Sequence, residues 1–203
     1  EVDTRLRPSG KGGLLVQSIE GFADYQRTDA WTWEHQALLR SRAVAGGAAL
    51  RDRYESLRVE LLRTAVRRQT LREDVRSMRE RMRSELSKSK AGEFDLKQDA
   101  GGITDVEFLA QYWTLLWSAR HAELVTYSDN IRQLESLASI CLVPQETVDV
   151  LTAAYRAYRQ RLHHLSLEGG ENVAPAAGFE STRAAVTAIW RQTMETSLQS
   201  TSD

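Results

Sequence analysis

Three charged residues near the start of the sequence alternate along one extended segment. The segment V-D-T-R-L-R places Asp3, Arg5 and Arg7 at every second position, and side chains two residues apart share one face of a β-strand. A carboxylate suits Mg²⁺, and guanidinium groups bind phosphate oxygens, so the three side chains predict a site for a metal ion and a polyphosphate. Ion pairs on a solvated strand face would give the same alternation, and the spacing alone leaves both interpretations open.

Two further acids occur at the start of a strongly apolar stretch. The sequence D-A-G-G-I-T-D-V-E-F, residues 99–108, opens a segment that is apolar on nearly every side, so we expect a central, buried helix. The helix dipole favours Asp105, whereas Glu107 lies deeper and would cost several kcal/mol if it were buried unpaired. We expect both acids to fasten the helical part of the chain to its β-containing part, unless they contact a ligand directly. The candidate partners are Arg5, Arg7, Arg40 and Arg42.

A basic stretch at residues 63–83, R-T-A-V-R-R-Q-T-L-R-E-D-V-R-S-M-R-E-R-M-R, is the candidate for binding nucleic acid. Basic helices bind phosphates, but this one lacks interleaved aromatic residues and keeps an intact apolar stripe. We therefore interpret it as a packed helix with a solvated basic face and do not expect nucleic acid as a partner. Docking of an acidic protein on this face stays open.

The remaining reactive residues give weaker signals. The adjacent His163 and His164 diverge by about 100° around a helix, so they cannot chelate one metal ion together. Gly101-Gly102 could present N–H groups to an anion, but we interpret the pair as a simple turn that lets the chain enter the helix. Cys141 is interpreted as a small core residue. Four tryptophans are assigned to packing in the core or between domains: Trp31, Trp33, Trp113 and Trp117.

The charged residues near the start require a β-containing segment, which we place at residues 1–47. Alternation predicts a strand at V-D-T-R-L-R, a second at L-L-V-Q-S and a third at L-R-S-R-A-V-A-G-G. Between the last two, Ser18 and Glu20 start one helix, and W-T-W-E-H-Q-A-L-L forms another. Three strands are too few for an independent sheet, so this segment should be the tail of a larger domain whose other strands precede it.

Residues 48–203 show helical patterns only, and no strand is expected after Gly47. Apolar residues recur every three or four positions and predict a series of helices. They lie at 48–63 and 65–86, after Thr104 and Ser128 as caps, after Pro144, and around Phe179 to Trp190. The expected fold class is therefore mainly α, a helical bundle preceded by a small β-containing remnant.

The totals exclude several classes of protein. A hydrophobic content of 41% over 203 residues suits a globular chain, and a net charge of -1 gives no general reason to expect binding to nucleic acid or anionic lipid. The single cysteine excludes an internal disulfide and suits a reducing compartment. The sequence has no signal peptide and no apolar run near the ~20 residues that span a bilayer. We expect a soluble, cytoplasmic protein without membrane contact.

Two long blocks together resemble one enzyme family. The first, EVDTRLRPSGKGGLLVQSIEGFADYQRTDAWTWEHQALLRSRAVAG, is similar to the end of a nucleotidyltransferase domain in the glutamine synthetase adenylyltransferase family. The second, FDLKQDAGGITDVEFLAQY, resembles the signature that opens the helical domain that follows. The stretches SDNIRQLESLA and YRAYRQRLHHLSL fit the same helical domain, so the resemblance covers essentially the whole chain.

Members of that family contain two such halves, of which one attaches AMP to a tyrosine of glutamine synthetase and the other removes it by phosphorolysis. VDTRLRPSG and AWTWEHQALLRSR resemble the C-terminal, adenylylating half, since the other half typically has VDMRLRP and GGIREIEF. The resemblance thus implies that residues 1–47 are the C-terminal part of a truncated nucleotidyltransferase domain. Residues 48–203 would form the helical bundle domain of a bifunctional enzyme that regulates nitrogen assimilation.

The resemblance also implies roles for the site residues. Such an active site has a glycine-serine turn, a D-x-D carboxylate pair and a third acid on a later strand, and Asp3 matches the third acid. Asp3 would help to bind Mg²⁺ (or Mn²⁺) or to remove the tyrosine proton, with ATP as substrate. Arg5 and Arg7 would neutralise phosphate charge or anchor the two acids of the buried helix. The 203 residues contain no G-S…D-x-D run, so we expect this chain alone to be inactive.

The partners implied by the resemblance are glutamine synthetase and the PII signalling protein, with glutamine as an effector. The helical part would then be a scaffold and a regulatory surface. A different class of function stays open, in which the helical part is an interaction module without chemistry. Its basic helix would dock glutamine synthetase, PII or the enzyme's own other half.

Overall fold

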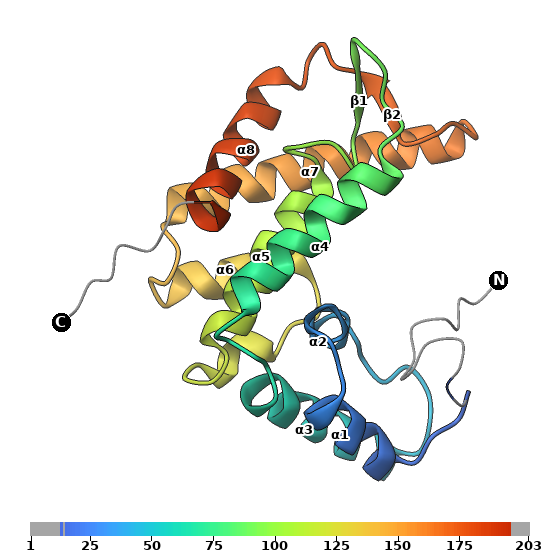
Figure 1. Ribbon diagram of the computed structural model, residues 1–203, viewed down its shortest axis with the longest axis vertical. Coiled ribbons are helices and arrows are strands. Elements are labelled where there is room, and N and C mark those ends of the chain that lie inside the picture. Colours follow the sequence, from blue (N-terminus) through green and yellow to red (C-terminus); the bar gives the residue numbers. More distant parts are fainter. Residues whose placement is uncertain (1–12, 14, 196–203) are drawn as a thin grey trace. The chain divides into compact units, whose positions relative to one another are not determined.

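The computed structural model of the chain describes residues 13 and 15–195 (Figure 1). That part contains eight α-helices, a 3-10 helix and one sheet of two strands, so the prediction of a mainly α fold is confirmed. None of the helices described combines the length and the apolar character needed to cross a bilayer. The strand predicted at V-D-T-R-L-R, with Asp3, Arg5 and Arg7, lies outside the described residues.

The chain divides into two compact units, which are described separately. The first contains the described residues up to Asp74 together with Gln111–Gln133. The second contains Val75–Ala110 and the described residues from Leu134 onward. The domain boundary predicted after residue 47 stays a prediction.

The first unit is built on helix α3, Ala48–Thr64, against which α1 (Ile19–Thr28) and α2 (Thr32–Leu39) pack. All three helices were expected from the sequence. The predicted start of α1 is confirmed, because Ser18 Oγ accepts the N–H of Gly21 at 3.1 Å. The 3-10 helix η2, Ala122–Val125, contacts α3. Leucines of α2 and α3 form the buried core of this unit: Leu38, Leu39, Leu61 and Leu62.

Arg58 in α3 is only 2% exposed and binds main-chain oxygens. Its guanidinium donates to the carbonyls of Leu38 (3.1 Å), Leu39 (2.6 Å) and Val125 (2.9 Å). Burial lowers the pKa of Arg58. The first two carbonyls belong to the last turn of α2, where the helix dipole favours a cation, so Arg58 closes the C-terminal end of α2.

Two of the strands predicted in this unit are wrong in the part that is described. Residues 15–18 form no strand, and Ser18 instead caps α1. The stretch L-R-S-R-A-V-A-G-G starts inside α2 and continues as a connection to α3. Its polar groups have local partners, since Ser41 Oγ donates to Leu38 O at 2.7 Å and Ala43 N donates to Glu55 Oε1 at 2.9 Å. The alternation of polar and apolar residues in this short connection therefore gave the same sequence pattern as a strand.

The second unit combines helices with the small sheet (Figure 1). Its described elements are most of α4 (Leu71–Leu86), β1 (Glu93–Asp95), the first half of α5 (Ile103–Trp117), most of α6 (Asn130–Ser139), α7 (Gln145–Leu167), β2 (Val173–Pro175) and α8 (Glu180–Met194). Strands β1 and β2 pair antiparallel with Phe94 opposite Ala174, and α7 packs against α8. The expectation that no strand follows Gly47 is therefore wrong. Strands of three residues are too short for alternation to be recognised.

Several boundaries differ from those predicted. Helix α4 begins at Leu71 instead of residue 65, and Thr104 lies inside α5. At the start of α6, Asp129 Oδ1 accepts the N–H of Arg132 at 3.0 Å, so Asp129 takes the capping role assigned to Ser128. Pro144 does precede α7, as predicted.

Three of the residues assigned to packing are exposed, namely Cys141, Trp31 and Trp33. Cys141 is exposed in a left-handed turn, with φ of 58°, so its assignment as a core residue is wrong. Trp113 is buried, but Trp31 is 66% exposed and Trp33 is 36% exposed. Packing of Trp31 against another domain stays a prediction.

Candidate functional site

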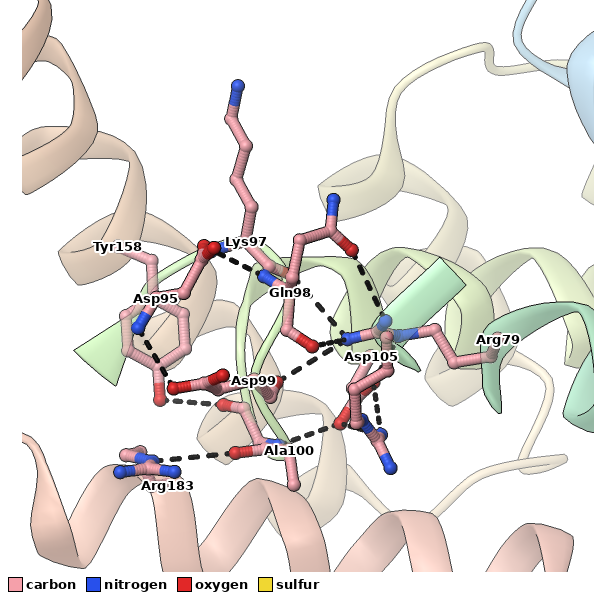
Figure 2. A network of polar contacts seen from close by, with 11 residues as sticks. Arg79, Asp95, Lys97, Gln98, Asp99, Ala100, Asp105, Tyr158 and Arg183 are labelled. Carbon is pink, nitrogen blue, oxygen red and sulfur yellow. Dashed lines mark hydrogen bonds and ion pairs between the residues drawn. The ribbon is translucent and has the colours of Figure 1, made fainter. Parts of the chain in front are cut away.

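The segment from the last residue of β1 to the start of α5, residues 95–102, folds around its own acidic side chains (Figure 2). Asp95 Oδ1 accepts the N–H groups of Lys97 and Gln98 at 2.9 and 3.0 Å. Asp99 Oδ2 accepts the N–H of Asp95 at 2.9 Å, and Asp99 O accepts the N–H of Gly102 at 3.0 Å. Carboxylates that accept N–H groups of their own loop replace the sheet or helix bonds that these residues lack, so the loop has a defined shape.

A buried ion pair holds this loop to α4. Arg79 is 0% exposed and Asp105 is 1% exposed, and Arg79 Nε lies 2.6 Å from Asp105 Oδ1. The other end of the same guanidinium reaches the loop, where Nη2 donates to Gln98 O at 2.9 Å and to Asp99 O at 3.4 Å. Burial lowers the pKa of Arg79, and the neighbouring carboxylate of Asp105 opposes that shift.

The second oxygen of Asp105 binds the glycine turn ahead of α5. Asp105 Oδ2 accepts the N–H of Gly101 at 2.7 Å, and Arg83 Nη2 lies 3.3 Å from both carboxylate oxygens. Gly101 has a φ of +77°, and a Cβ there would overlap the carbonyl oxygen of Arg183. A side chain is thus excluded at Gly101 by both backbone conformation and space. The N–H of Gly101, a candidate for anion binding, is thus bound by the carboxylate of Asp105 from the same chain.

Aromatic and cationic side chains from α7 and α8 complete the surroundings of the turn (Figure 2). Tyr158 OH donates to Gly101 O at 2.9 Å, and Arg183 Nε donates to Ala100 O at 3.4 Å. The Arg183 guanidinium also lies 4.2 Å from the ring centroid of Phe94. Burial raises the pKa of Tyr158, which therefore remains a neutral donor. We call Arg79, Arg83, Asp105 and the loop 95–102 the Arg79–Asp105 network.

The structure brings Asp105 into this network, and Glu107 lies two residues further along α5. Glu107 is half-buried, and Tyr155 OH donates to its Oε1 across 3.5 Å. The arginines bound to Asp105 are Arg79 and Arg83 of α4, a helix whose arginines are predicted from the sequence to form a solvated basic face. That assignment is wrong for Arg79. A usable signal was its position four residues after Val75, which continues the buried stripe of α4.

The other predicted site residues are not placed. Asp3, Arg5 and Arg7 lie outside the described residues, so their proposed roles toward a metal ion, a phosphate or the acids of α5 stay predictions. Within the part of the chain that is described, no group of three or more His, Cys, Asp or Glu residues could hold a metal ion. The acids and cations of the Arg79–Asp105 network bond to one another, so its chemical role is to position α5 and the loop.

Comparison with known proteins assigns both parts of the chain. Residues 1–57 match the family model for glutamate-ammonia ligase adenylyltransferase, and residues 69–199 match the model for GlnD PII-uridylyltransferase. Over 195 residues, 96% of this chain, the sequence is 48% identical to the bifunctional glutamine synthetase adenylyltransferase/adenylyl-removing enzyme of Thioalkalivibrio sulfidiphilus (strain HL-EbGR7). The chain belongs to the glutamine synthetase adenylyltransferase family. It spans 20% of the length of that relative.

The two candidate sites fall within the matches to two different family models. Asp3 lies within the match to the adenylyltransferase model, whereas the Arg79–Asp105 network lies within the match to the uridylyltransferase model. The resemblance inferred from the two sequence blocks is therefore confirmed. The block FDLKQDAGGITDVEF, which carried much of that resemblance, is the segment that builds the Arg79–Asp105 network.

Proposed function

We propose that this chain is part of an enzyme that transfers AMP from ATP to a tyrosine of glutamine synthetase and so regulates nitrogen assimilation. The observation that supports the proposal most directly is the 48% identity to a bifunctional glutamine synthetase adenylyltransferase/adenylyl-removing enzyme over 96% of the chain. The residues of the motifs VDTRLRPSG and GGITDVEF favour the C-terminal, adenylylating half. A cytoplasmic location fits the single cysteine.

In this proposal Asp3 is the third active-site acid, and Mg²⁺ or Mn²⁺ is the cofactor. The metal would stabilise the charge that develops as the tyrosine hydroxyl attacks and pyrophosphate leaves. Asp3 would bind the metal or hold the proton of that hydroxyl, while Arg5 and Arg7 would neutralise phosphate charge or anchor Asp105 and Glu107. Because the 203 residues contain no D-x-D pair after a glycine-serine turn, this chain alone is expected to transfer no AMP.

The test uses the whole enzyme that carries this chain. Asp3→Asn should lower AMP incorporation into glutamine synthetase by at least about 100-fold, because a metal-binding carboxylate contributes several kcal/mol to transition-state stabilisation. Phosphorolytic removal of AMP should be unchanged if the segment belongs to the adenylylating half. Asp52→Asn is the matched control, since Asp52 is an exposed acid within the same family match. Near-normal incorporation by Asp3→Asn would refute the proposed role.

A second function is favoured by the match of residues 69–199 to the PII-uridylyltransferase model. The helical part would then dock a protein partner, either glutamine synthetase or PII, and communicate with the catalytic site, with glutamine as an effector. The 203-residue chain should then bind one of these proteins in a pull-down with purified components while it incorporates no AMP. Measurable AMP transfer by this chain would contradict the expected inactivity, and the absence of binding to both proteins would exclude the docking function.

A further inference from the structure

An apolar groove of about 420 Å³ lies in the first unit, between the start of α1, the connection that precedes α3 and the first turns of α3. Its apolar wall consists of Leu15, Ile19, Phe22, Ala43, Ala45 and Leu50. Leu15 is 70% exposed and Leu50 is 55% exposed. Large apolar side chains that gather around one exposed groove mark a surface for an interaction partner.

Two aromatic residues give part of the wall a fixed shape. The ring centroids of Phe22 and Tyr54 lie 6.1 Å apart. Ser41 Oγ donates to Leu38 O at 2.7 Å, so Tyr54 OH is the donor of the 2.5 Å bond between the two hydroxyl groups. Burial raises the pKa of Tyr54, which keeps this donor protonated. The groove is therefore formed before anything binds in it.

The charges of the groove lie at its edge. Among the described residues that line it, only Arg42 and Arg51 are charged, and both side chains are exposed. A group that enters the groove must therefore offer apolar side chains to the wall. It can also offer acceptor oxygens, such as the carbonyls of an extended segment, to the two guanidinium groups.

The chain itself contains a segment with these properties next to the groove. Leu15 belongs to the wall, so the residues before it start at the groove. The alternation in V-D-T-R-L-R places Val2, Thr4 and Leu6 on one side of an extended segment and its three charged residues on the other. The residues between, P-S-G-K-G-G-L, are rich in turn formers and extend to at most about 25 Å, which is ample for a reversal of the chain.

The covalent connection decides between this segment and a free molecule. A group tethered by a short linker has an effective concentration in the millimolar range at its site. A second copy of the chain, or a free apolar molecule, would have to exceed that concentration or bind more tightly. The apolar side of residues 2–7 also requires a surface to cover it, because an exposed Val and Leu gain free energy when they are buried.

We propose that residues 2–7 of this chain bind in the groove through Val2, Thr4 and Leu6, and that the groove thereby directs Asp3 to the opposite side of the segment. Leu50 and Phe22 are then positioning residues for Asp3, which they do not need to touch. The binding in the groove is independent of AMP transfer, whereas its effect on catalysis rests on the proposed function.

Pairs of cysteines test which side of residues 2–7 faces the groove. Cys141, which is exposed, is first replaced by serine in the 203-residue chain. Val2→Cys and Leu6→Cys are each combined with Leu50→Cys, and Arg5→Cys with Leu50→Cys is the matched control from the charged side. At least one of the first two pairs should form a disulfide about 10-fold faster than the control, because the bond requires Cβ atoms about 3.5–4.5 Å apart.

Hydrogen exchange tests the wall of the groove. Leu50→Ser should accelerate the exchange of the amides of residues 2–7 by about 10- to 100-fold, as expected for the loss of one apolar contact surface. Leu167→Ser is the matched control, since Leu167 is a strongly exposed leucine of the second unit. Unchanged circular dichroism spectra establish that each variant is folded. If Leu50→Ser fails this check, Leu15→Ser replaces it, because Leu15 lines the same groove and is more exposed.

The whole enzyme tests the positioning of Asp3. Leu50→Ser should lower AMP incorporation into glutamine synthetase by about 10-fold, and Leu50→Met, which keeps an apolar side chain of similar size, should restore it. Phosphorolytic removal of AMP should stay unchanged in both variants, whereas a general folding defect would lower both activities.

Three results would overturn the proposal. They are equally fast disulfide formation from the charged side, unchanged exchange of residues 2–7 in a folded Leu50→Ser variant, and a dimer of the chain that Leu50→Ser dissociates, which would assign the groove to a second copy. Normal AMP transfer by Asp3→Asn would refute the catalytic role of Asp3 and leave the disulfide and exchange results as they are. Conversely, Asp3 can be catalytic in a chain whose groove binds something else, so the two proposals fail separately.

Discussion

Replacing Asp105 by alanine tests whether the buried ion pair stabilises the second unit. The change removes the acceptor of the Arg79 Nε–H bond at 2.6 Å, of the Gly101 N–H bond at 2.7 Å and of the longer bonds from Arg83. Breaking a buried pair by removing one partner costs about 3–5 kcal/mol, because a buried charge is left without compensation. The carbonyls of Gln98 and Asp99 still accept from Arg79, which places the expected loss near the lower limit, about 3 kcal/mol.

Urea unfolding followed by circular dichroism measures this loss. A loss of about 3 kcal/mol lowers the midpoint by about 1–1.5 M if the slope is about 2–3 kcal/mol per M. Hydrogen exchange of the amides of residues 95–105 provides a local measurement, since the loop bound by Arg79 should open more often. Glu135→Ala is the control, because Glu135 is an exposed acid of the same unit and its removal should change stability by less than about 0.5 kcal/mol.

The double variant distinguishes a specific pair from two independent residues. Arg79→Met combined with Asp105→Leu removes both buried charges and should be more stable than either single variant. Losses that simply add would show that the two residues do not act on each other. A loss below about 1 kcal/mol in Asp105→Ala would likewise refute the assignment of this pair as the main link between α4 and the loop.

Two further predictions concern His35 and Gly101. Burial lowers the pKa of His35 below 6.5, so the unfolded chain binds a proton first as the pH falls. The free energy of unfolding should then decrease below about pH 6.5, by at most about 1.4 kcal/mol per pH unit, until the lowered folded-state pKa is passed. His35→Gln should flatten that part of a urea-midpoint profile; an unchanged profile would exclude His35 as its cause. Gly101→Ala should destabilise the chain more than Gly92→Ala, because both glycines have positive φ but open space surrounds only Gly92; equal thermal midpoints would contradict the close approach at Arg183 O.

The helices could be predicted largely because their signals are local. Ser18 with Glu20 fixed the start of α1, and Pro144 preceded a stripe of buried residues along α7. The strands could not be predicted, since β1 and β2 are three residues long and their partners Phe94 and Ala174 are 80 positions apart in the sequence. Their stability comes from that long-range pairing and from the aromatic contact of Phe94 with Tyr158, which no local pattern encodes.

The candidate site was predictable in part, because a charge in an apolar context demands a partner. That reasoning required a partner for Glu107 and considered only arginines of the first 47 residues, whereas the arginines that the structure places at an acid of α5 are Arg79 and Arg83 of α4, at Asp105. A better criterion is to look for a basic residue that also lies on an otherwise apolar, buried helix face. Arg79 follows Leu71 and Val75 at steps of four along a buried stripe of α4, and Asp105 lies in the buried first turn of α5. Each side chain therefore provides the opposite charge that the other needs when it is buried.

The same criterion fails for Arg58, and the reason limits its use. Arg58 also lies on a buried stripe, but its hydrogen bonds at the end of α2 go to main-chain carbonyls, and the nearby carboxylate of Glu55, 3.8 Å from Nη1, is itself 43% exposed. Main-chain acceptors leave no mark in the sequence, because every residue carries one and only the fold decides which of them lack a helical partner. A buried arginine therefore predicts an ion pair only when the sequence also contains an acidic residue within a buried, apolar helix. Asp105 meets that condition for Arg79, whereas Arg58 binds the carbonyls at the C-terminal end of α2.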